Sequence, residues 1–158
     1  MKLIEVEIKN VRGIRDLTLR PAGSNLVVWG PNGTGKSAVI DAIDFLLTGR
    51  VSRLSGRGTG NLSLEDHGPH VDETAKNAIV RAVVELPGGS NQFEIKRCMD
   101  NPRKMICDNQ AEESLKSIVD LAKRGQHVLT RREILQYITS ESGNRAQQIQ
   151  ALLNISDV

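Results

Sequence analysis

An eight-residue motif constrains the fold of this chain more than any other feature of its sequence. Residues 30–37 are Gly-Pro-Asn-Gly-Thr-Gly-Lys-Ser and match the pattern G-x-x-x-x-G-K-[ST] at every fixed position. The apolar run 26–29 precedes this motif, and apolar residues at helical spacing follow it over 39–47. We therefore expect a buried strand, a glycine-rich loop and an amphipathic helix in succession, which is the setting of a P-loop.

The residue types of this loop suit the binding of a triphosphate. Glycine is needed where the backbone turns through positive φ, and a helix N-terminus directs free N–H groups at the same anion. Lys36 can place its positive charge on the β- and γ-phosphates and is the candidate catalytic residue, and the Ser37 hydroxyl can ligate magnesium. The expected ligands are therefore ATP and Mg²⁺. The loop residues expected to bind them are Gly30, Asn32, Gly33, Thr34, Gly35, Lys36, Ser37 and Ala38.

The rest of the chain predicts an antiparallel layer beside a parallel core strand at 26–29. Further strands are expected at 3–8, 14–19, about 78–86, 92–98 and 104–107. Helices are expected from Lys36 to about Gly49, at about 111–124, from Thr130 through Tyr137, and from Asn144 past Leu153. Residues 49–77, rich in Gly, Ser, Arg and Asp, predict a long and partly mobile surface loop. The fold class that follows is α/β, with a mixed sheet and flanking helices.

The composition agrees with one globular domain. The 158 residues are 39% apolar and 25% charged, and no apolar run approaches the roughly 20 residues that a membrane span needs. Glu5 and Glu7 interrupt the N-terminal segment, which leaves no signal-peptide core, so we expect a cytoplasmic protein without a membrane partner. Cys98 and Cys107 flank a turn and can face each other across a hairpin, and the cytosol would keep them reduced. The net charge of +2 neither requires nor excludes nucleic acid.

Two stretches that flank the P-loop carry a family resemblance. Residues 9–13 are Lys-Asn-Val-Arg-Gly, and residues 40–49 are IDAIDFLLTG. Together with the P-loop they resemble the opening of the SMC, RecF, RecN and SbcC family of DNA-repair and chromosome ATPases, and a weaker similarity extends over 127–155. The resemblance implies an ABC-type head in which Arg12 contacts the nucleotide phosphates; a solvent-exposed arginine in a strand-to-turn segment is the alternative. Arg131 and Arg132 stand near the position of the family's Q-loop glutamine, which is a departure from the pattern.

The sequence contains neither the acid pair of a Walker B strand nor a Ser-Gly-Gly signature. We therefore interpret residues 1–158 as the N-terminal lobe of a larger SMC- or ABC-type ATPase head, with 143–158 leading toward a coiled coil. By resemblance, the full-length protein would hydrolyse ATP and act in DNA repair, chromosome maintenance or phage defence. Its partners would be the C-terminal lobe of the same ATPase, a second head that engages as a homodimer on ATP binding, and DNA. This lobe alone would bind ATP and hydrolyse it weakly or not at all.

A small stand-alone P-loop nucleotide kinase or NTPase is the alternative interpretation. Such an enzyme would place parallel strands and helices after the P-loop helix, and its lid would need several arginines. The arginines available for such a lid, or for contacts with DNA phosphates, are Arg50, Arg53 and Arg57.

Overall fold

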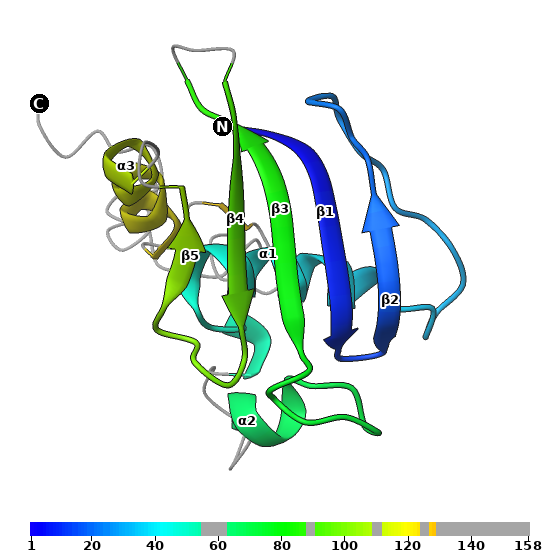
Figure 1. Ribbon diagram of the computed structural model, residues 1–158. Coiled ribbons are helices and arrows are strands. Elements are labelled where there is room, and N and C mark those ends of the chain that lie inside the picture. Colours follow the sequence, from blue (N-terminus) through cyan, green and yellow to red (C-terminus); the bar gives the residue numbers. More distant parts are fainter. Residues whose placement is uncertain (55–62, 88–90, 109–111, 124–126, 129–158) are drawn as a thin grey trace, which may run out of the picture.

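A five-stranded antiparallel sheet with one long helix across one of its faces organises the chain (Figure 1). The computed structural model describes residues 1–54, 63–87, 91–108, 112–123 and 127–128. The strand order is β2-β1-β3-β4-β5, and every neighbouring pair is antiparallel. The strands are β1 (Lys2–Val11), β2 (Ile14–Leu19), β3 (Ile79–Glu85), β4 (Gln92–Cys98) and β5 (Met105–Cys107).

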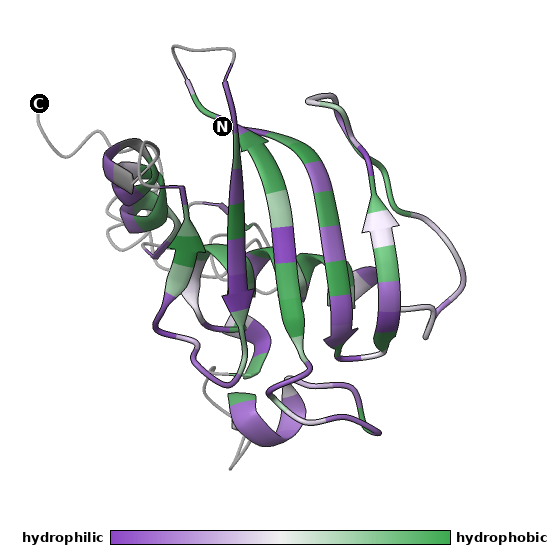
Figure 2. Cartoon of the chain, in the orientation of Figure 1, coloured by the Kyte–Doolittle hydropathy of each residue, from purple (hydrophilic) through white to green (hydrophobic). Residues whose placement is uncertain are grey.

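Hydrophobic and hydrophilic residues alternate along the strands (Figure 2). The burial of alternate residues gives the sheet one apolar and one charged face. Val6 of β1 pairs with Ala82 of β3, and both side chains are fully buried. On the opposite face Arg81 lies 3.2 Å from Glu5 and 2.7 Å from Glu94, so the charges of three neighbouring strands are paired. This two-sided pattern is the one expected for an antiparallel sheet that is covered on one face.

The helix that covers the apolar face is α1 (Lys36–Thr48). Gly35 precedes it at φ 87° and Gly49 ends it at φ 73°, donating its N–H to the Phe45 oxygen at 2.8 Å. These left-handed conformations suit glycine at both ends. The other helices are the 3-10 helix η1 (Ser52–Leu54), α2 (Leu64–His67) and α3 (Glu112–Lys123), the last of which lies against α1.

The predicted fold class is confirmed, as are the five antiparallel strands, the P-loop helix and the helix at about 111–124. Within the described residues no parallel strand follows α1, which argues against the small-kinase alternative. The described parts of 49–77, expected as one loop, include η1 and α2. None of the helices in the described ranges is long and apolar enough to cross a membrane.

Two expectations are wrong. Residues 26–29 do not form a parallel core strand: they have no regular structure, and Val27 and Trp29 are 81% and 88% exposed. A strand exists only when a neighbour accepts and donates its backbone hydrogen bonds, and no described strand lies beside this segment. The cysteines do not face each other either, because the register places Cys107 opposite Ile95, three residues from Cys98. The helices predicted beyond Thr130, the Q-loop stretch and 143–158 lie outside the described residues.

Candidate nucleotide-binding site

The P-loop turns sharply into the start of α1. Gly33 and Gly35 adopt φ 86° and 87°, a conformation that is unfavourable for residues other than glycine. The Thr34 hydroxyl donates to the Pro31 oxygen at 2.9 Å and thereby closes the loop internally. The first N–H groups of α1 have no carbonyl one turn before them, so they point at whatever lies in front of the helix. The loop therefore presents backbone donors and the positive end of the helix dipole to the same space.

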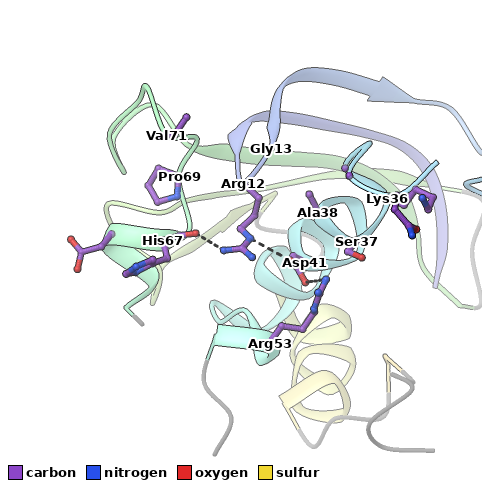
Figure 3. Close-up of a pocket in the computed structure, with 14 residues that line it drawn as sticks. Arg12, Gly13, Lys36, Ser37, Ala38, Asp41, Arg53, His67, Pro69 and Val71 are labelled. Atoms are coloured by element: carbon purple, nitrogen blue, oxygen red, sulfur yellow. Dashed lines mark hydrogen bonds and ion pairs between the residues drawn. The ribbon is translucent and has the colours of Figure 1, made fainter. Parts of the chain in front are cut away.

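That space is a cavity of about 560 Å³ in front of α1 (Figure 3). Seven of the residues expected from the sequence line it: Arg12, Asn32, Gly33, Gly35, Lys36, Ser37 and Ala38. The side chain of Thr34 closes the loop and Gly30 adopts φ 154°, and neither residue is among those that line the cavity. The lining residues that were not expected are Gly13, Asp41, Arg53, Asp66, His67, Pro69 and Val71.

Lys36 folds back onto its own loop. Its ammonium donates to the Gly30 oxygen at 2.6 Å and to the Pro31 oxygen at 2.5 Å. An ammonium group has three N–H donors, so Lys36 can contact the loop and an anion at once. Lys36 is one of the residues that line the cavity, but its ammonium is directed at Gly30 and Pro31, which do not line it.

Arg12 is held in place by its backbone as well as by its side chain. It follows β1 at φ 55°, and its N–H donates to the Gly68 oxygen at 2.8 Å. Its Nη1 donates to the His67 oxygen at 2.7 Å, and its side chain is 30% exposed. A non-glycine residue at positive φ is strained and persists only where its surroundings fix it. The β1–β2 turn and the end of α2 fix Arg12 at the cavity wall.

Asp41 lies on α1 four residues after Ser37, on the same face of the helix, and only 3% of its side chain is exposed. Its Oδ2 lies 3.5 Å from Arg12 Nε and its Oδ1 lies 3.7 Å from Arg53 Nη1. Burial raises the pKa of Asp41, and the charges of Arg53 and Arg12 oppose that shift. Figure 3 shows both arginines pointing toward Asp41.

The arrangement can bind a polyanion. Arg12, Lys36, Arg53 and the N-terminus of α1 provide positive charge on one cavity, against the carboxylates of Asp41 and Asp66. Among the residues described, no group of three or more His, Cys, Asp or Glu side chains could hold a metal ion by itself. Backbone N–H groups at a helix N-terminus beside basic side chains are donors that suit phosphate, and Ser37 adds one hydroxyl at the start of the helix.

Sequence comparison finds curated relatives that match part of this chain. "DNA replication and repair protein RecF" of Pseudoalteromonas atlantica is 40% identical over 55 residues, which is 35% of this chain and 15% of the relative. RecF of Shewanella sp. (strain MR-4) is 27% identical over 122 residues, 76% of this chain and 31% of the relative. The chain thus spans less than a third of the length of these curated relatives.

Structural comparison supports the same fold. A chain from a study of ATP-driven dimerization and DNA-stimulated activation of SMC ATPases superposes with a TM-score of 0.69 at 18% identity, covering 96% of this chain and 99% of that one. The likeness therefore extends over the whole lobe rather than the P-loop alone. At the level of sequence families, an AAA domain model (AAA_23) matches residues 5–157. This chain belongs to that AAA domain family and has the fold of an SMC ATPase head lobe.

Proposed function

We propose that this chain is the ATP-binding N-terminal lobe of an SMC- and RecF-like ATPase that acts on DNA in the cytoplasm, in repair or chromosome maintenance. The observation that carries the proposal is the cavity in front of α1, which is lined by P-loop residues and by the basic residues Arg12, Lys36 and Arg53. The membership of the AAA domain family and the RecF relatives agree with nucleotide use.

The residues of the site would make different contacts with the nucleotide and its metal ion. The N–H groups at Gly33 to Lys36 bind phosphate oxygens, while Lys36 and Arg12 neutralise their charge. The Ser37 hydroxyl holds Mg²⁺ next to the phosphates, and the metal supplies further neutralisation of charge. These groups bind and orient the nucleotide, but none of them is a base that activates water. We therefore propose that hydrolysis depends on residues contributed by a second lobe.

The exposure of the apolar segment 26–29 is a further reason to propose a second lobe. Val27 is 81% and Trp29 is 88% exposed, although the segment leads directly into the P-loop. Large apolar side chains gathered on a surface mark a site where another protein surface binds. We propose that the C-terminal lobe of the same ATPase pairs with this segment and turns it into the strand that the sequence pattern indicates. A second head and DNA would then join the completed, ATP-bound head.

Nucleotide titration tests the proposal directly. The chain should bind ATP more tightly with Mg²⁺ than without it, and Lys36→Ala should weaken binding by at least about tenfold in calorimetry. Lys104→Ala, between β4 and β5 and outside the cavity, is the matched control and should bind as the parent does. A folded Lys36→Ala variant with unchanged affinity would refute the role of the P-loop.

The activity of the lobe alone is a second measurement. We expect little or no steady-state phosphate release from the chain by itself. Turnover that Lys36→Ala abolishes would mean that the lobe carries its own catalytic groups and would contradict the two-lobe proposal. On the full-length protein with hydrolysis blocked, ATP should increase both the mass in solution and the affinity for DNA.

A further inference from the structure

We propose that Asp41 is a positioning residue: it holds Arg12 and Arg53 at the wall of the cavity and so strengthens triphosphate binding, although its own charge is negative. The inference rests on the proposed function, since it assigns a task within the same cavity. It concerns a residue on the P-loop helix that does not itself donate to a phosphate.

The geometry is that of one carboxylate shared by two guanidinium groups. Arg12 Nε approaches Oδ2 at 3.5 Å and Arg53 Nη1 approaches Oδ1 at 3.7 Å, so each oxygen of Asp41 faces a different arginine. The arginines come from opposite sides of α1 in the sequence, one from the β1–β2 turn and one from η1. The carboxylate therefore joins two otherwise separate segments at the cavity.

Burial makes this contact effective. The side chain of Asp41 is 3% exposed, whereas those of Arg12 and Arg53 are 30% and 49% exposed. A charge on a rigid helix in a poorly solvated position attracts opposite charges more strongly than one in water does. Arg53 in particular has a long side chain that would otherwise sample many rotamers. Asp41 limits that sampling and keeps the guanidinium next to the cavity.

The direct and the indirect effects of Asp41 have opposite signs. As a bare negative charge beside an anion, Asp41 repels the phosphates, so its neutralisation should tighten ATP binding. As a positioning residue it orders two cations that attract the phosphates, so its neutralisation should weaken binding. The two arginines outnumber the one carboxylate, which leaves this cluster with a net positive charge. We therefore expect the indirect effect to exceed the direct one.

The experiment compares variants of the whole chain by calorimetry with Mg²⁺–ATP. Asp41→Asn keeps the size of the side chain and removes its charge, and it should weaken binding about five- to tenfold. Asp41→Glu, which restores the charge, should recover part of the loss. Asp120→Asn is the control and should bind as the parent does, because Asp120 is an exposed carboxylate on α3 that does not line the cavity. Thermal melting of each variant reports whether the fold is retained.

A background without the two arginines separates positioning from a general loss of structure. When Arg12 and Arg53 are both alanine, Asp41→Asn should no longer weaken binding and should leave it unchanged or tighten it. A merely structural role for Asp41 would weaken binding equally in both backgrounds and would overturn the inference. So would an Asp41→Asn variant that binds ATP as tightly as, or more tightly than, the parent chain.

The Lys36→Ala variant, measured in the same series, distinguishes a failure of the positioning role of Asp41 from a failure of the proposed function. If Lys36→Ala weakens binding and Asp41→Asn does not, only the positioning role fails. If the parent chain does not bind ATP, or if Lys36→Ala binds as the parent does, the proposed function fails and the positioning role with it.

Discussion

His127 Nε2 lies 2.9 Å from Asp44 Oδ1, and this contact joins the segment after α3 to the C-terminal half of the P-loop helix. Both side chains are nearly buried, at 14% and 4% exposed. Asp44 also accepts a hydrogen bond from the Ser52 backbone N–H at 2.7 Å. One carboxylate therefore attaches both η1 and the segment at His127 to α1. The helix that carries Ser37 and Asp41 is thus fastened in its C-terminal half by Asp44.

The stability that Asp44 contributes should depend on pH. Burial alone would raise the pKa of Asp44, but the hydrogen bonds from His127 and Ser52 outweigh it and hold the pKa below its usual 3.8. A carboxyl with a lowered folded-state pKa contributes stability above the unfolded value and loses it as the pH falls through the folded value. Asp44→Asn should therefore cost about 1–3 kcal/mol at pH 7 and progressively less below about pH 4.

Urea unfolding of the parent chain and Asp44→Asn at several pH values checks this prediction. Asp72→Asn, whose carboxylate is 55% exposed, is the control and should cost less than about 1 kcal/mol at pH 7. A cost for Asp44→Asn that stays constant down to pH 3 would show that the ionised carboxylate is not the stabilising species.

Arg97 should stabilise the fold by binding the C-terminal end of α1. Its guanidinium is 3% exposed and donates to the oxygens of Leu46 at 2.9 Å, Leu47 at 3.4 Å and Pro102 at 2.5 Å. A cation at this end also complements the helix dipole. Arg97→Met keeps the apolar part of the side chain but leaves buried carbonyls without a donor, so we expect a loss of about 2–4 kcal/mol.

The control for Arg97 is Lys96→Met on the opposite face of β4, which should change the free energy of unfolding by less than about 1 kcal/mol. Equal effects of the two substitutions in chemical denaturation would mean that the cap on α1 adds no stability.

Gly49 should tolerate no side chain. It adopts φ 73°, and a Cβ there would overlap the Pro102 carbonyl oxygen and approach Arg97 Nη1 at 2.9 Å. Gly49→Ala should therefore destabilise the chain by about 2 kcal/mol or more, through backbone strain and displacement of the arginine cap. Gly13→Ala is the matched control, since nothing lies within 4 Å of a Cβ at that position and its φ is not positive. Thermal melts that fall equally for both substitutions would contradict the prediction.

The sequence predicts those elements whose determinants are local. The P-loop, α1 and the alternating strands follow from patterns within about ten residues, so their bounds are close to those of the structure, except that β1 continues to Val11. Residues 26–29 carry the apolar pattern of a buried strand, yet a strand also needs a neighbour, and pattern alone does not reveal whether one is present. The strand predicted at this segment is therefore wrong because no described strand lies beside it, although its apolar character was recognised correctly.

The residues of the site also fall into those that a local motif predicts and those that only the folded chain brings together. The loop residues 30–37 are recognisable because one short sequence motif specifies the geometry of a phosphate-binding loop. The contact of Arg12 with Asp41 and His67 depends on the sheet, which brings together positions as much as 55 residues apart. Asp41 had one usable signal, its spacing of four residues from Ser37 on a helix, whereas Arg53 had only its place in a basic stretch.

The exposed segment before the P-loop gives the last prediction. Val27 and Val71 are both highly exposed, at 81% and 89%, but only Val27 belongs to the apolar run 26–29. A charged residue at either position should leave the stability of the chain within about 0.5 kcal/mol, because neither side chain is buried. If the C-terminal lobe pairs with 26–29, Val27→Asp should place an unpaired charge in that interface and weaken lobe association by at least about tenfold. Val71→Asp should not weaken it.

Co-purification of the chain with its C-terminal lobe, followed by measurement of their affinity, distinguishes the two valines. Melting of each variant alone comes first, so that a loss of association cannot be assigned to unfolding. If both variants bind the lobe as the parent does, the C-terminal lobe does not cover 26–29.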